Sequence, residues 1–204
     1  MDFRSPLQSI IPGATGRILT ALGRTTAELN LRTAAEIAGV SIAQTSRTLR
    51  RLVENGVVSR REAAPSSLFT LNRRHISAPV IERLLDSPAE AVRRMRATTK
   101  AITPSPVNIT LFGSVARGSA TSSSDIDVLV IRPRSAEDDD EPWTSSLQRW
   151  IDGVHDLCGN RVNVLEIGAA EAPRLLRAKR PPWNEIIAEG VTLAGPDIRD
   201  TRRA

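Results

Sequence analysis

The chain has 204 residues, a single cysteine and a formal net charge of +5. This length accommodates one large domain or two small ones, each able to bury its own core. One cysteine, Cys158, excludes an intrachain disulfide framework and a cysteine metal cluster. No apolar run approaches the ~18 residues of a membrane span, and the first residues lack the apolar core of a signal peptide. We therefore expect a cytoplasmic protein without a membrane partner.

Positive charge is concentrated in the first part of the chain. Residues 1–78 contain 11 Arg and 5 acidic residues, a balance of +6, whereas the rest contains 17 basic and 18 acidic residues, a balance of −1. A polyanion such as DNA suits this asymmetry, although a basic solvated surface has the same composition. We expect a DNA-binding domain over 1–78, linking helices over 79–102 and a second domain over 103–204.

The first domain carries the signals of a helix-turn-helix. Apolar residues recur at helical spacing over 14–22. Thr33 to Glu36 then reads as a capping box that opens a short helix, and Gly39 is a stop signal. Ser41 to Gln44 reads as a second capping box, whose helix ends at Asn55-Gly56. Two helices joined by a tight glycine turn are typical of a helix-turn-helix.

The second helix of this pair is the predicted DNA-reading element. Its apolar residues Ile42, Leu49, Leu52 and Val53 are expected to face the core. The remaining polar side chains are then expected to face outward, where they can read base edges or hold phosphates. These residues are Ser41, Gln44, Thr45, Arg47, Thr48 and Arg51.

A predicted hairpin follows, with strands over 57–61 and 67–71 around Pro65-Ser66. Arg60 and Arg61 lie where such a hairpin would meet a phosphate backbone, although a solvated hairpin is an equal alternative. In element order, capping and charge, residues 13–72 resemble the winged helix-turn-helix of MarR-like and ArsR-like bacterial regulators. That resemblance implies duplex DNA as a partner and a homodimer.

Two helices, over 79–85 and 88–102, are expected to join the domains. An apolar strand over 107–112 then stops at Gly113-Ser114, where a glycine lets the backbone approach a ligand and a hydroxyl can donate a hydrogen bond. A helix that opens at Ser114 to Arg117 would point its free N–H groups at the same place and favour an anion.

Two carboxylates come next, Asp125 and Asp127, at the start of a second apolar strand. The two-residue period of a strand places both on one face. Two such close charges raise each other's pKa unless a cation lies between them, and their hard oxygens suit Mg²⁺ or Mn²⁺ together with nucleotide phosphates. Taken alone, a DxD sequence is commonly just the polar start of a strand, and Gly-Ser is commonly an ordinary turn. The order of the two along the chain favours a nucleotide site instead.

The residues from Gly113 to Val130 match the pattern GSxARGxxxxxSDIDxxV. This pattern resembles the signature of the minimal nucleotidyltransferases of the DNA polymerase β superfamily, and the resemblance covers about residues 88–195. It implies an α/β domain with a small mixed sheet. It also implies that Gly113 and Ser114 hold an NTP, that Asp125 and Asp127 bind the metal, and that a later strand supplies a third carboxylate. We assign Arg117 and Ser124 to nucleotide binding as well.

The third carboxylate is expected on the strand over 161–167. Alignment on the family pattern places Asn163 where an aspartate often stands. Glu166 lies three residues after Asn163, so in a regular strand the two side chains face opposite sides. Glu166 reaches the face of Asn163 only if a bulge intervenes or the alignment is shifted. We predict Glu166 as the third catalytic and metal-binding acid, with the position of Asn163 left open.

The remaining segments frame this domain. Residues 137–141, EDDDE, are expected to form a solvated acidic loop, because consecutive residues cannot converge on one ion. A helix over 143–157, helices over 172–178 and 183–189, a strand over 190–195 and a frayed end over 199–204 complete the prediction.

The leading hypothesis is a DNA-binding regulator whose nucleotidyltransferase domain moves a nucleoside monophosphate from NTP to a protein or RNA acceptor. The alternative is a regulator whose transferase-like domain senses nucleotide or dimerises without catalysis, and Asn163 favours it. A third hypothesis places the protein in a toxin–antitoxin pair, a common setting for similar domains.

Overall fold

In the computed structural model of the protein, residues 1–137 and 140–201 are described. The chain forms two compact units: residues 4–87 with Asp2, and residues from Pro88 onward with Met1 and Phe3. The long helix α5 (Ala78–Thr98) contributes to both, with Pro88 inside it. The prediction of two separate linking helices is therefore wrong. Proline usually ends a helix because it lacks an N–H donor, but the apolar pattern continues through this one.

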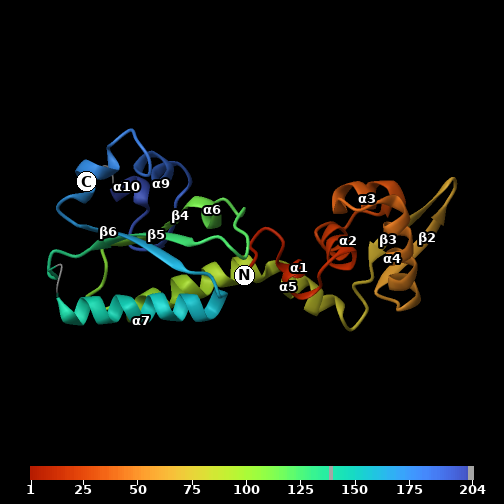
Figure 1. The fold of residues 1–204 in the computed structure, drawn as a ribbon, viewed down its shortest axis with the longest axis horizontal. Coiled ribbons are helices and arrows are strands. Elements are labelled where there is room, and N and C mark those ends of the chain that lie inside the picture. Colours follow the sequence, from red (N-terminus) through yellow and green to blue (C-terminus); the bar gives the residue numbers. More distant parts are fainter. Residues whose placement is uncertain (138–139, 202–204) are drawn as a thin grey trace. The chain divides into compact units, whose positions relative to one another are not determined.

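The unit of residues 4–87 is a helix-turn-helix with a hairpin (Figure 1). Its sheet is antiparallel in the order β1-β3-β2, and β2 pairs with β3 from Val58–Leu71 to Ala63–Ser66. One apolar core joins helices and hairpin and includes Leu7, Ile18, Leu22, Leu49 and Leu71. The elements are α1 (Pro6–Ile10), α2 (Ala14–Gly23), β1 (Leu29–Asn30), α3 (Leu31–Ala38), α4 (Ile42–Glu54), β2 (Val58–Ala63) and β3 (Ser66–Leu71).

The two helices of the motif begin at side-chain caps. At α4, Ser41 caps as predicted, because its Oγ accepts from the backbone N–H of Gln44 at 3.3 Å. At α3, however, the cap is Asn30, whose Oδ1 accepts from the Thr33 N–H at 2.9 Å. Thr33 itself lies inside the first turn, so its predicted capping role is wrong. Gly39 ends α3 with φ at +59°, the left-handed conformation that glycine adopts without cost.

Helix α4 presents a different face to the core from the one predicted. Thr45 and Thr48 are buried, with 0% and 8% of their surface exposed, whereas Ile42 is 50% exposed. Leu49 and Leu52 are buried as expected. The buried face thus runs through 45, 48, 49 and 52, and two threonines expected to face outward pack inside instead.

The second unit is built on a four-stranded mixed sheet in the order β6-β5-β4-β7. Strand β4 pairs antiparallel with β5 and β7, and β5 pairs parallel with β6. Helices α5 and α7 cover one face, and α8, α9 and α10 lie on the other (Figure 1). The elements are β4 (Asn108–Phe112), α6 (Gly113–Ala116), β5 (Ile126–Arg132), α7 (Glu141–Cys158), β6 (Val162–Gly168), α8 (Ala172–Leu176), α9 (Trp183–Glu189), β7 (Val191–Ala194) and α10 (Ile198–Thr201).

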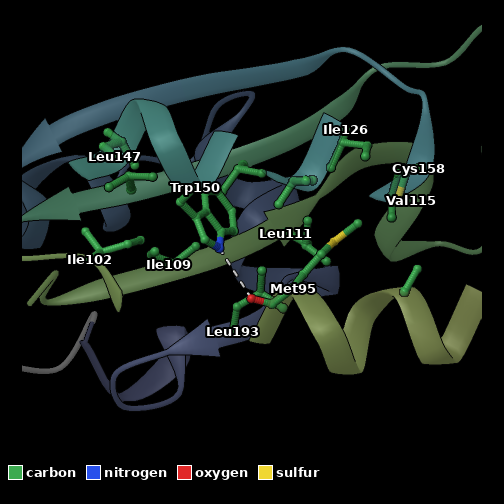
Figure 2. Packing of buried hydrophobic residues seen from close by; sticks show 14 of the residues in the cluster. Met95, Ile102, Ile109, Leu111, Val115, Ile126, Leu147, Trp150, Cys158 and Leu193 are labelled. Atoms are coloured by element: carbon green, nitrogen blue, oxygen red, sulfur yellow. Dashed lines mark hydrogen bonds between the residues drawn. The ribbon is translucent and has the colours of Figure 1, made fainter. Parts of the chain in front are cut away.

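The core between the sheet and helices α5 and α7 contains a tryptophan whose indole is both packed and hydrogen-bonded (Figure 2). Trp150 packs among the apolar side chains and donates its indole N–H toward the Met95 carbonyl at 3.4 Å and the Thr98 Oγ1 at 3.1 Å. A buried tryptophan needs such a partner for its N–H. Burial in this core also raises the pKa of the Cys158 thiol, so this cysteine does not provide a thiolate.

Two predicted segments lie partly outside the described residues. Asp138 and Asp139 of the predicted acidic loop are not described, and neither are residues 202–204 of the predicted frayed end. Residues 198–201 form the short helix α10 instead of the frayed end predicted from the sequence, and Ile198 is fully buried under the sheet. Within the described residues, no helix has both the length and the apolar character to cross a membrane.

The buried Thr45 provides a test of the packing of α4. Among the described residues, its Oγ1 is the buried side-chain atom without a hydrogen-bond partner. An unpaired buried hydroxyl costs on the order of 1–3 kcal/mol. Thr45→Val, which replaces the hydroxyl by a methyl group of similar size, is expected to raise the free energy of unfolding by about 1 kcal/mol. Thermal or urea unfolding measures the change; a loss of stability would show that the hydroxyl is paired in solution.

Candidate functional site

The centre of the site is a close approach between Asp127 and the backbone at Gly113. Strand β4 runs antiparallel to β5, and Phe112, its last residue, lies opposite Asp127. Gly113 follows with φ at +68°, and a Cβ added there would lie 2.7 Å from the Asp127 Oδ2. Only glycine combines this backbone conformation with this lack of side chain. The predicted phosphate turn and the predicted metal-binding carboxylate therefore meet at one point.

A short helix follows this turn. Helix α6 is a single turn, Gly113–Ala116, and the Arg117 N–H returns to the Gly113 carbonyl at 3.1 Å. The Ser114 carbonyl accepts the N–H groups of both Ser119 and Ala120, which folds the chain back toward β5. A helix this short adds little dipole to an anion site, so backbone N–H groups and the Ser114 hydroxyl remain the available donors.

The position of the third carboxylate is occupied by an amide. Strands β5 and β6 pair without a bulge, and Asp127 lies opposite Asn163. The Asn163 Nδ2 donates to the Asp127 Oδ1 at 3.0 Å. Glu166 lies three residues later and hence on the opposite face, where its Oε1 accepts from the Trp143 indole at 2.9 Å and pairs with Arg132. The prediction that Glu166 joins Asp125 and Asp127 is wrong for this reason.

The loop before β5 places Asp125 and Ser124 at the edge of the site. Asp125 is exposed and lies one residue before β5, so the strand does not fix it on the face of Asp127. The Ser124 Oγ accepts from the Thr121 N–H at 3.0 Å and so holds the turn that leads to Asp125. The buried Asn160 donates to the carbonyls of Thr121 and Ser124. Asn160 was not assigned to the site from the sequence, yet its two bonds fix this loop.

Helix α9 contributes two carboxylates that sequence reasoning did not assign to the site. Arg117 forms an ion pair with Glu189 in the last turn of α9. Glu185, one turn earlier, lines a hollow of about 500 Å³. Pattern alone could not find them, because α9 follows the signature by many residues and reaches it only in the folded domain. The hollow is lined by Phe112, Gly113, Ser114, Arg117, Asp127, Asn163, Val164, Leu165, Pro182 and Glu185.

The available oxygens fit a divalent cation that arrives with a nucleotide. Among residues 1–137 and 140–201, no three His, Cys, Asp or Glu side chains are placed to hold a metal. Asp127 lines the hollow, and Asp125, two residues earlier in the chain, is exposed and is the nearest carboxylate in sequence that could join it. Mg²⁺ is commonly bound by one or two carboxylates, with substrate phosphates and water completing its shell. The site therefore suits Mg²⁺ or Mn²⁺ as a partner of bound NTP.

The polar face of α4 is narrower than predicted. Gln44, Arg47 and Arg51 are exposed, with Ser41 at the cap. The Arg51 Nη2 donates to the Thr15 Oγ1 at 2.8 Å, which directs this guanidinium toward α2. Thr45 and Thr48 lie in the core and cannot contact DNA as predicted.

The hairpin arginines have carboxylate partners. Arg61 forms a bidentate pair with Glu28 and holds the pKa of that carboxyl below its usual value. Arg60 pairs with Glu62 at 2.7 Å and donates to the Ser67 Oγ. All four ion-pair side chains are more than a third exposed, so these pairs contribute little to stability and can exchange for other anions.

Comparisons with known proteins agree with this division. The nucleotidyltransferase domain model matches residues 92–178, and the IclR helix-turn-helix domain model matches residues 15–62. No curated protein sequence matches the chain. The matching helix-turn-helix model is thus the IclR one, where the sequence resembled MarR-like and ArsR-like regulators.

Solved structures of low similarity were also found. One is a toxin–antitoxin with AMP-PNP, at 15% identity and a TM-score of 0.38, covering 55% of this chain and 81% of that one. Another is a mutant of the toxin–antitoxin MntA-HpeT, at 14% identity and a TM-score of 0.38 over the same shares. The chain itself joins a helix-turn-helix of IclR type to a nucleotidyltransferase domain.

Proposed function

We propose that this protein binds duplex DNA through its helix-turn-helix and transfers a nucleoside monophosphate from NTP to an acceptor hydroxyl at the site around Asp127. The observation that carries the proposal is the approach of the Asp127 carboxylate to Gly113, which unites a metal-binding group with a phosphate turn. In this assignment, Gly113, Ser114 and Arg117 bind the triphosphate, and Asp125 and Asp127 hold Mg²⁺ or Mn²⁺.

The residues act by position and charge. The Gly113 backbone and the Ser114 hydroxyl donate to phosphate oxygens, and Arg117 adds a guanidinium that leaves Glu189 for the phosphates. Ser124 and Asn160 hold the loop that carries Asp125. The cation, when bound, neutralises charge on the phosphoryl group and on the leaving pyrophosphate.

A second candidate function is favoured by Asn163. Its amide occupies one oxygen of Asp127, where a carboxylate would otherwise assist the acceptor. A domain that binds nucleotide without transfer would sense NTP and tune DNA binding. Nucleotide binding is common to both functions, and labelling of an acceptor separates them.

The first prediction concerns the metal-dependent step shared by both functions. NTP is expected to bind only with Mg²⁺ or Mn²⁺, and Asp127→Asn is expected to abolish this dependence because the amide cannot replace the anionic ligand. Calorimetric titration of ATP with and without Mg²⁺ measures it. Glu171→Gln, a charge change at an exposed residue outside the hollow, is the matched control. Equal cation dependence in wild type and Asp127→Asn would contradict the assignment.

The second prediction separates the enzyme from the sensor. Wild-type protein incubated with Mg²⁺ and each radiolabelled NTP is expected to label an acceptor in lysate, and Asp127→Asn is expected to label none. Nucleotide binding without labelling, together with labelling by Asn163→Asp, would establish the sensor instead. Absence of nucleotide binding would reject both functions.

The third prediction concerns DNA. Arg47 is exposed on α4, and Arg47→Ala is expected to weaken specific binding by ~1–3 kcal/mol if its guanidinium bonds a guanine, or to lower the salt slope by about one if it meets a phosphate. Fluorescence anisotropy with a selected duplex at several salt concentrations distinguishes these outcomes. Arg134→Ala, the same charge change at an exposed arginine of the other unit, is the control.

Unchanged affinity and salt slope for Arg47→Ala would remove Arg47 from the interface. Replacing Arg60 and Arg61 together then tests the hairpin, whose contribution is expected to be purely salt-dependent.

The expected homodimer is tested by light scattering of the same full-length protein, free and with DNA. A monomer in both conditions would contradict it.

A further inference from the structure

We propose that Glu185 is the base of the transfer reaction, taking the proton of the acceptor hydroxyl in place of the carboxylate that β6 lacks. This role rests on the proposed nucleotidyl transfer. Glu185 lies on α9, whereas the third acid predicted from the sequence, Glu166, lies on β6. Three observations lead to it: the orientation of α9, the composition of the hollow, and the state of the other carboxylates.

The orientation of α9 is fixed on two sides. Trp183 and Ile186 are buried against Leu129 and Ile131 of β5, which anchors the inner face of the helix. Glu189 pairs with Arg117, directly after α6. Residues four apart lie on the same face of a helix, so Glu185 occupies the same side as Glu189, one turn nearer the helix start. That side is the one turned toward the Gly113-Ser114 turn.

The hollow between these elements contains few acids. Of its lining residues, all of them described, Asp127 and Glu185 are the two carboxylates, and they approach it from β5 and α9 respectively. A nucleotide held at Gly113 and Ser114 would place its phosphates between them. This separation allows one carboxylate to serve the cation and the other to serve the acceptor.

The other carboxylates near the sheet are less suited to this role. Asp127 lies against Gly113, accepts from Asn163 and is assigned to the cation, as is Asp125. Glu166 faces α7 and bonds Trp143. Glu189 pairs with Arg117 in this structure and does not line the hollow. Glu185 lines the hollow and is exposed to solvent there.

The step balances as a displacement at phosphorus. The acceptor oxygen forms a bond to the α-phosphorus while the bond from that phosphorus to the bridging oxygen breaks, and pyrophosphate leaves with the electron pair. The hydroxyl proton passes to the Glu185 carboxylate and then to water. The cation assigned to Asp125 and Asp127 would neutralise charge on the phosphates and would take no part in this proton transfer.

The test uses the full-length protein and the substitution Glu185→Gln, which keeps the shape and removes the base. Labelling of the acceptor with radiolabelled NTP is expected to slow by at least about 100-fold, the lower range for loss of a general base. Binding of ATP with Mg²⁺, measured by calorimetry, is expected to remain within about threefold of wild type, since a base binds no phosphate. Glu171→Gln serves as the matched control and is expected to keep both.

The split between kcat and KM gives a readout that a structural role would not move. In Glu185→Gln, kcat is expected to fall while the KM for NTP stays near that of wild type, because a base acts on the acceptor proton and binds no phosphate. Two outcomes would overturn the role of Glu185 and leave the proposed nucleotidyl transfer in place. One is a Glu185→Gln variant that labels the acceptor at the wild-type rate, and the other is a Glu185→Gln variant that no longer binds ATP. If wild-type protein binds ATP and labels no acceptor under any condition, both the transfer function and this role for Glu185 are rejected.

Discussion

The site depends on the contact between the Asp127 carboxylate and the backbone at Gly113. A β-carbon at position 113 would lie 2.7 Å from the carboxylate oxygen, and φ at this residue is +68°. Any other residue would both strain the turn and push the carboxylate away from the place where phosphates would lie. Strand pairing fixes the other partner, because Phe112 lies opposite Asp127 and thus brings the turn to the start of β5. Every other group at the site is placed relative to this contact.

The two-residue period of the strands decides which side chains can join it. Asp127, Leu129 and Ile131 lie on the face covered by α8, α9 and α10, while the residues between them face α5 and α7. The unbroken register of β5 with β6 carries this alternation to Asn163 and Glu166. Glu166 therefore serves the opposite face, where its bonds to Trp143 and Arg132 compensate a partly buried carboxylate.

Local signals in the sequence were enough to predict much of the fold. Ser41 caps α4, Gly39 ends α3 and Gly113 makes the turn, because each depends on the backbone within a few residues. Faces and distant partners were harder to predict. Thr45 and Thr48 carry hydroxyls and look like surface residues, but neighbouring elements decide which side of α4 is buried. Glu185 joins the hollow only because α9 packs against β4 and α6, a contact that no periodicity in the sequence encodes.

Both proposed anion-binding surfaces of the protein are already paired with its own carboxylates. Arg117 pairs with Glu189 beside the nucleotide hollow, and Arg61 pairs with Glu28 on the hairpin. Water reaches both pairs and screens them, so each contributes little to stability, and a triphosphate or a DNA phosphate can replace the carboxylate at small cost. The carboxylates keep each guanidinium oriented before its ligand arrives. In the proposed transfer this exchange has a further consequence, because the same helix that pairs with Arg117 carries Glu185. A phosphate that draws Arg117 away from Glu189 would leave Glu185 as the α9 carboxylate that lines the hollow, opposite the proposed nucleotide.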